Sequence, residues 1–230
     1  MNEEEPLSAD ACRGFAVIAR ACVEALANEP VEEVVDGVRH AAQAVGEARF
    51  DGARADAALR QRYYDRFFVS ASPFFLPLCE SSVRGAVEEG GRLRYAPAGG
   101  ARADHVLACY RVAGFEHRDV GGFDLAVKTL KPDSMVAELA FMASLAAAAA
   151  ADAEDPAAAR RAACLLRQFA CEHAAGWFAA AARYAARADD DFYAGVCSLA
   201  AWAVKAVAAR TEGDEGRAMR PSSFRARGGV

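Results

Sequence analysis

The residues best able to do chemistry in this chain are four histidines and seven cysteines, and their spacing excludes the common helical metalloenzymes. Di-iron bundles need Glu-x-x-His pairs, but no glutamate stands three residues before His40, His105, His117 or His173. Covalent haem needs C-x-x-C-H, and nucleotide loops need G-x-x-x-x-G-K-[ST] or G-x-G-x-x-G. None of these patterns occurs. We therefore predict no catalytic, cofactor-binding or metal-binding residue, and no enzyme activity.

The cysteines are odd in number and never form C-x-x-C. Most lie among apolar or alanine neighbours in helical patterns, where a free cysteine packs as a small hydrophobic residue. Reduced structural thiols of this kind indicate a reducing compartment and argue against a zinc site. The seven are Cys12, Cys22, Cys79, Cys109, Cys164, Cys171 and Cys197.

Two apolar stripes have both a structural and a functional interpretation. His173 lies at helical spacing from Phe169 and Trp177, and we favour a half-buried histidine bonded to a neighbouring helix over a ligand-binding one. Met135 and Met142 lie on a second stripe, which is either a core face or a pliable peptide groove, since methionine adapts to varied partners. The core interpretation is favoured there too.

Composition predicts that these residues are held by helices. The chain has 230 residues, of which 58 are alanine and 54% are hydrophobic. Alanine favours helix but buries little surface, and β-branched residues are sparse. We predict an all-α fold, a single bundle of about eight to ten helices. Its N-terminal and C-terminal parts would be joined by a flexible connector at about 116–131, in a domain over 1–210, with a disordered tail at 211–230.

Charge and hydropathy limit the partners. Lys plus Arg total 27 against 32 Asp plus Glu, a net charge of −5, so we expect no nucleic-acid partner. The longest apolar stretch, 139–151, is too short and too alanine-rich for membrane insertion. The acidic N-terminus lacks the pattern of an export signal. These features predict a cytoplasmic protein.

Helical periodicity and helix breakers divide the chain into segments. Residues 70–100 hold three prolines and five glycines, which indicates a long irregular connection with one short helical turn after Glu80. Pro132 is expected to open a helix, because its missing N–H costs nothing in the first turn, and Asp133 suits the positive helix end. Helices are predicted at 8–27, 31–45, 102–114, 132–151, 155–187 and 191–209. A further helix is predicted after a linker at 46–53, with Leu59, Tyr63 and Phe67 on one side.

A series of motifs in fixed order resembles the TorD/DmsD family of cytoplasmic chaperones for molybdenum enzymes. The motifs are Y-D-R-F-F at 64–68, P-L-C-E-S at 77–81, Y-R-V-A-G-F at 110–115, K-P-D-S-M-V-A-E-L-A-F-M at 131–142, F-A-C-E-H-A-A-G-W at 169–177 and F-Y at 192–193. The resemblance implies a chaperone that binds a molybdoenzyme catalytic subunit, or its twin-arginine leader, until cofactor insertion is complete, which prevents premature export. It further implies a monomer or homodimer, the latter formed by exchange of the C-terminal part.

The resemblance also implies a client-binding site, and the sequence departs from the family there. The family's E-P-D-H stretch reads Lys131-Pro132-Asp133-Ser134, and the second glutamate of E-L-E-F-M is Ala140. A positive charge replaces a negative one, which should weaken attraction for an arginine pair and favours a client without a leader. The candidate peptide-binding or client-binding residues are Pro77, Glu80, Ser81, Pro132, Asp133 and Ser134.

Other interpretations of these segments stay open. Pro132 and Asp133 fit a helix start, and Glu80 and Ser81 fit a cap of the short helix after them. The apolar loop at 69–78 has two equally favoured interpretations. It is either a lid over a groove or a segment that packs beneath the bundle. The alternative function from another class is a small-molecule or guanine-nucleotide-binding helical protein without a protein client.

Overall fold

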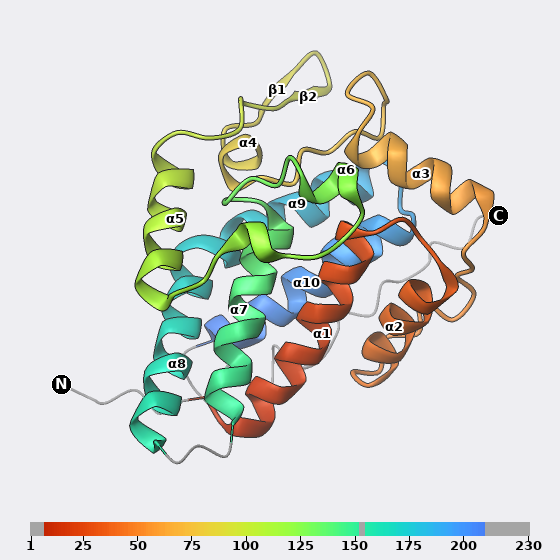
Figure 1. Ribbon diagram of the computed structural model, residues 1–230. Helices are drawn as coiled ribbons and strands as arrows, with labels where there is room; N and C mark the ends of the chain where they lie inside the picture. Colours follow the sequence, from red (N-terminus) through yellow and green to blue (C-terminus); the bar gives the residue numbers. More distant parts are fainter. Residues whose placement is uncertain (1–6, 152–154, 210–230) are drawn as a thin grey trace.

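Helices make up nearly all of the secondary structure in a computed structural model that describes residues 7–151 and 155–209 (Figure 1). The predicted all-α class is confirmed. In chain order the elements are α1 (Ala9–Ala27), α2 (Glu32–Gln43), α3 (Ala57–Phe67), α4 (Glu80–Arg84), β1 (Val87–Glu89), β2 (Arg92–Arg94), α5 (Ala101–Ala113), η1 (His117–Asp119), α6 (Asp124–Val127), α7 (Met135–Ala150), α8 (Pro156–Phe169), η2 (Ala170–Ala174), α9 (Ala175–Ala188) and α10 (Phe192–Ala208).

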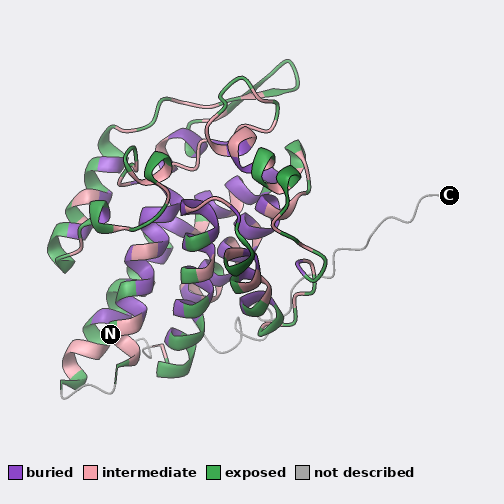
Figure 2. Ribbon diagram, turned by 45° about the vertical axis from the view of Figure 1, so that its right-hand side comes forward, coloured by how far each residue is buried: buried purple, intermediate pink, exposed green. Residues whose placement is uncertain are grey.

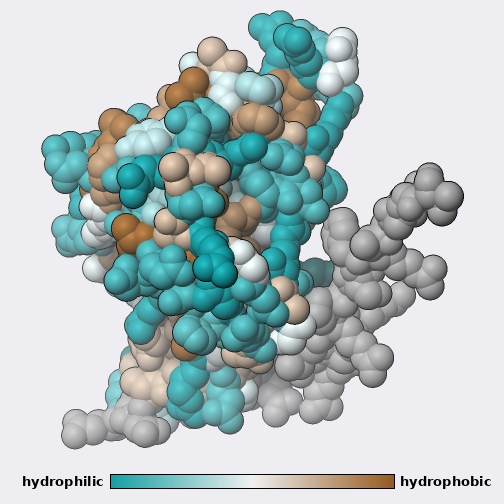
Figure 3. Space-filling view, turned by 90° about the vertical axis from the view of Figure 1, so that its right-hand side faces the viewer, coloured by the Kyte–Doolittle hydropathy of each residue, from teal (hydrophilic) through white to brown (hydrophobic). Residues whose placement is uncertain are grey.

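The core lies where α1, α7 and α10 pack together, with α8 and α9 alongside them. Helices α7 and α10 are buried over most of their length, whereas the hairpin is exposed (Figure 2). Alanine on α7 and α10 allows this close packing, and large side chains such as Trp177, Tyr110 and Tyr193 fill the remaining space. The described residues include no helix able to cross a membrane. The face in Figure 3 is mainly hydrophilic, with apolar residues scattered across it, as on most folded proteins.

Short local signals set most helix boundaries. Ser8, Asp155 and Asp191 accept hydrogen bonds from the first turns of α1, α8 and α10, as N-caps do. Gly114 ends α5 in the left-handed conformation, with φ of 68°. These boundaries agree with the predicted ones to within one or two residues.

Four local predictions need correction. Pro132 does not open a helix, because α7 begins at Met135 with Ser134 as its N-cap. The irregular stretch 70–100 contains an antiparallel hairpin, β1 and β2, which turns at Gly90 and Gly91 with positive φ. The helix predicted over 155–187 contains a π-helical turn, η2. The helix predicted over 31–45 ends at Gln43, two residues before the predicted end.

The predicted connector contains ordered turns in the structure. It holds η1 and α6, and the backbone N–H of Phe123 donates to Ala27 O of α1 at 2.9 Å. Gly122 lies so close to α1 that a Cβ there would come within 2.7 Å of that same oxygen. Whether the connector bends in solution stays a prediction, and the tail predicted at 211–230 lies outside the described residues.

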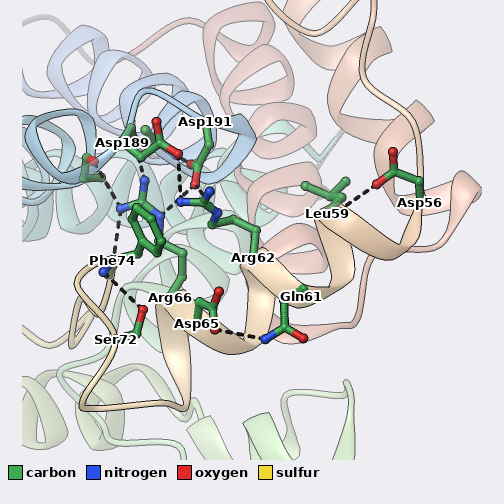
Figure 4. Close-up of polar contacts among 12 residues, drawn as sticks. Asp56, Leu59, Gln61, Arg62, Asp65, Arg66, Ser72, Phe74, Asp189 and Asp191 are labelled. Atoms are coloured by element: carbon green, nitrogen blue, oxygen red, sulfur yellow. Dashed lines mark hydrogen bonds and ion pairs between the residues drawn. The ribbon is translucent and has the colours of Figure 1, made fainter.

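A buried arginine joins α3 to the turn between α9 and α10 (Figure 4). Arg66 donates from Nε to Asp191 Oδ2 at 3.0 Å, and from its two terminal nitrogens to the carbonyl oxygens of Ala185 at 3.1 Å and Asp189 at 2.5 Å. Nearby, the Arg62 guanidinium covers the ring of Phe74 at 3.7 Å. This Arg66 cluster fixes the end of the C-terminal helices against the N-terminal part.

Candidate functional site

Two segments far apart in sequence meet at the start of α7. Residues 77–81 and 132–134 form an antiparallel bridge between Cys79 and Ser134. The N–H of Glu80 donates to Asp133 O at 2.7 Å, and the N–H of Met135 donates to Leu78 O at 2.9 Å. We call this contact the α4–α7 junction. It brings together all six of the candidate site residues predicted from sequence.

Asp133 stabilises α4 rather than its own helix. Its Oδ2 accepts from the backbone N–H of Ser81 at 3.0 Å and from the Ser81 hydroxyl at 2.5 Å. The Ser134 hydroxyl oxygen instead caps α7, accepting from Ala137 N at 3.2 Å. Asp133 is fully buried, and its Oδ1 has no hydrogen-bond partner among the described residues. The helix-start interpretation of Asp133 is thus wrong for α7, since this carboxylate caps the neighbouring helix.

Glu80 is a fully buried carboxylate surrounded by cationic and imidazole groups. Arg84 Nε donates to its Oε1 at 2.7 Å, and His173 Nδ1 lies 2.9 Å from its Oε2. Arg102 is a further ion-pair partner at 3.6 Å. Burial opposes ionisation of Glu80, but the His173 hydrogen bond and the Arg84 charge outweigh it, so that the pKa of this carboxyl is lowered. Glu80 therefore stays ionised inside the protein.

The pKa of a second carboxyl in the junction is shifted in the opposite direction. Glu138 on α7 is fully buried, and its Oε2 accepts from Trp177 Nε1 at 3.0 Å. Its Oε1 has no hydrogen-bond partner in the part of the chain described. Burial raises the pKa of Glu138 well above its ordinary value, and the Glu80 and Asp133 carboxylates add to that rise. Burial in the core therefore favours the neutral form of Glu138.

The polar contacts continue from Glu80 through His173 to the surface. His173 is buried, and its Nε2 lies 2.9 Å from Nδ1 of His105, which is exposed on α5. The two rings stack with centroids 4.9 Å apart. Cys109 follows His105 by one helical turn. The Sγ of Cys109 and one ring nitrogen of each histidine all lie within 4.8 Å of one another. The interpretation of His173 as a buried histidine bonded to a neighbouring helix agrees with this arrangement.

The candidate residues differ in how they meet solvent. Pro77, Ser81 and Pro132 are partly exposed, whereas Glu80, Asp133 and Ser134 are buried. The partly exposed residues form the outer surface, and the buried ones hold it in place. The loop before them packs under the bundle, since Leu76 is buried and its N–H donates to Arg66 O at 2.9 Å.

Sequence reasoning did not identify Arg84, Glu138, His105 or Cys109 as parts of this site. Arg84 carries no signal of its own, and Glu138 is marked only as part of the motif at 131–142. The roles of both depend on helices that meet only in the fold. The i, i+4 spacing of His105 and Cys109 on a predicted helix was a usable signal. It becomes informative only once His173 is known to lie opposite.

The protein is thus a helical bundle in which a buried polar network supports two partly exposed loops. The family model described as nitrate reductase delta subunit matches residues 26–183, from the end of α1 into α9. The chain belongs to this family, which comprises NarJ/TorD-type chaperones, and the TorD/DmsD resemblance is confirmed. The family serves molybdoenzyme maturation as a chaperone rather than as a catalyst. Comparisons with curated proteins and with solved structures gave no match.

Proposed function

We propose that the chain is a cytoplasmic chaperone that binds the apo catalytic subunit of a nitrate-reductase-type molybdoenzyme, and holds it until the molybdenum cofactor is inserted. The client would contact the surface over the α4–α7 junction. The observation that carries this proposal is the junction itself, where the bridge between Cys79 and Ser134 holds residues 77–81 against residues 132–134 and buried Asp133 fastens Ser81. Loops fixed on a rigid scaffold are common binding surfaces.

The charges at the junction favour a folded or partly folded apoenzyme over a twin-arginine leader. An arginine pair would need an accessible carboxylate. Glu80 is buried and already paired with Arg84, Arg102 and His173, and Asp133 is buried as well. Lys131, at the position where the resemblance places an acid, is exposed. Like charges across an interface suppress the wrong partner.

The placement of the site is tested by two matched substitutions in one loop. Pro77→Arg puts a bulky charge on the proposed surface, whereas Pro73→Arg puts the same charge on an exposed position four residues earlier. We expect Pro77→Arg to weaken binding of the apo catalytic subunit by more than about tenfold, in calorimetric titration, because the charge is not matched across the interface. Pro73→Arg should bind as the wild type does. Equal affinities for both variants would move the site elsewhere.

The choice of client element is tested with a synthetic leader peptide. The wild type should bind the apoenzyme without its leader and show no binding of the leader alone. Lys131→Glu should gain leader binding, and Lys128→Glu, an exposed position in the same connector, should not. Leader binding by the wild type as tight as apoenzyme binding would overturn the preference. Failure to bind any apo molybdoenzyme subunit from the same organism would overturn the proposed function.

A further inference from the structure

Three side chains with metal-binding chemistry converge beside the junction, and neither the family nor the proposed function explains them. His105 and Cys109 project from one face of α5, one turn apart, toward His173 on η2. The contact between His105 Nδ1 and His173 Nε2 is 2.9 Å, and Cys109 Sγ completes a group whose ligand atoms lie within 4.8 Å of one another.

The donor set and spacing suit a tetrahedral ion of borderline softness. Zinc binds imidazole nitrogen at about 2.0–2.1 Å and thiolate sulfur at about 2.3 Å. Across a tetrahedral ion these lengths place two nitrogens about 3.3 Å apart, and a nitrogen and the sulfur about 3.6 Å apart. The two histidine nitrogens therefore need to separate by a few tenths of an ångström, and Cys109 Sγ, which lies within 4.8 Å of them, needs to approach by up to about one ångström. His105 is exposed on α5, at the edge of the bundle (Figure 1), so its side chain is able to make that adjustment.

The surroundings of His173 resemble the outer shell of a metal site. Metal-binding histidines usually donate their second ring N–H to a carboxylate, which fixes the tautomer and raises the basicity of the other nitrogen. His173 makes this contact through Nδ1 with Glu80 Oε2, at 2.9 Å. Glu80 is in turn held by Arg84. The Nε2 lone pair of His173 is thereby directed toward His105.

The local backbone is also irregular where His173 lies. The five residues Ala170–Ala174 form a π-helical turn between α8 and α9. Such turns occur frequently at functional sites, because they shift side chains out of the regular helical register. Arg84 Nη2 donates to His173 O at 2.8 Å, which anchors this turn to α4.

We propose that His105, Cys109 and His173 bind one Zn²⁺ ion, with a fourth position left to water. The ion would tie α5 to the π-helical turn, next to the proposed client surface. The inference does not depend on the identity of the client. On binding, the Cys109 thiol loses its proton to solvent, and both histidines coordinate as neutral imidazoles.

The test is titration of the full, tag-free chain with Co²⁺ as a spectroscopic probe, followed by displacement with Zn²⁺. We expect a cobalt–thiolate charge-transfer band and tetrahedral d–d bands that saturate at one ion per chain. Cys109→Ser should abolish the thiolate band, and His105→Ala should weaken Co²⁺ binding by more than about tenfold. Both residues lie on α5 and are at least partly exposed, so neither change removes a core side chain.

Two control variants make the result specific. Cys164→Ser and His40→Ala change an exposed thiol and an exposed imidazole elsewhere, and both should titrate as the wild type does. A thiolate band that survives in Cys109→Ser but disappears in Cys164→Ser would overturn the assignment. Absence of a thiolate band in the wild type at a stoichiometric amount of Co²⁺ would overturn the site itself. The apoenzyme titrations described above test the proposed function independently of the zinc site, because they require no metal.

Discussion

Two buried polar clusters join the parts of this bundle, and they differ in how completely their members are paired. The Arg66 side chain is fully paired. Its guanidinium is 1% exposed, and every nitrogen has an acceptor on α9, on α10's cap or on the loop at Phe74 (Figure 4). A fully satisfied buried ion of this kind fixes one packing of the surrounding helices.

The α4–α7 junction is open by comparison. Its chain of contacts runs from Glu80 through His173 to exposed His105. It also leaves Asp133 Oδ1 and Glu138 Oε1 without partners among the described residues. Buried unpaired oxygens cost about 1–3 kcal/mol each, so we expect the junction to contribute less stability than the Arg66 cluster does. The difference separates a structural staple from a less completely paired network.

The largest expected effect comes from breaking the Arg66 cluster. Arg66→Met should destabilise the protein by about 3–5 kcal/mol, because it removes one partner of a buried ion pair and the donors that Arg66 supplies to the carbonyls of Ala185 and Asp189. Urea unfolding followed by circular dichroism measures this loss.

The matched control is Arg60→Met on the same helix. The Arg60 side chain is 57% exposed and its nearest carboxylate, on Glu29, is 3.9 Å away. Its replacement should change the free energy of unfolding by no more than about 0.5 kcal/mol. If Arg66→Met were as mild as Arg60→Met, the Arg66 cluster would not be the staple described above.

A smaller loss is expected at the junction. Asp133→Ala removes the acceptor for both hydrogen bonds from Ser81 and should cost about 1–3 kcal/mol in urea unfolding. Asp133→Asn keeps an accepting oxygen and should recover most of that stability, since Asn caps helices about as well as Asp.

The control for Asp133 is Asp124→Ala, which removes an exposed carboxylate on α6 that pairs with Lys128. It should cost no more than about 0.5 kcal/mol. An Asp133→Ala loss as large as that of Arg66→Met would contradict the comparison, because the junction would then be as tightly paired as the Arg66 cluster.

The two clusters also show what the sequence is able to predict. Helix starts at Ser8, Asp155 and Asp191 and the end at Gly114 follow from residues within one turn, so local chemistry identifies them. The motifs likewise pointed to both halves of the junction. The hairpin was missed because its strands have three residues each and Val87 is their only β-branched residue.

Pairings across the fold were beyond the sequence. Asp133 has the local pattern of a helix start, but its carboxylate caps α4, a helix 52 positions away along the chain. The burial of Arg66 depends on the carbonyls of α9. Glu138 resembles an ordinary helix-favouring residue until α7 is placed against Trp177. In each case the deciding partner comes from a different helix, which periodicity cannot reveal.

The sharpest test of the open junction is Glu138→Gln, whose effect is absent in acid and grows with pH. Burial, with the Glu80 and Asp133 carboxylates, raises the pKa of Glu138, while the Trp177 hydrogen bond and the Arg84 charge oppose this rise. The pKa of Glu138 is higher in the folded protein than in the unfolded chain. The neutral acid therefore makes its full contribution to stability when the pH is below the unfolded-state pKa. That contribution is lost as pH rises through the folded pKa.

Glutamine keeps the acceptor for Trp177 and cannot ionise, so Glu138→Gln should match the wild type at about pH 4 and become increasingly more stable than it toward about pH 8. Urea unfolding across that range measures the difference. Glu33→Gln, an exposed change on α2, should show no such divergence. Parallel stability curves for Glu138→Gln and the wild type would mean that Glu138 ionises freely when folded. Glu138 would then be in contact with water, and the junction would not be a buried network.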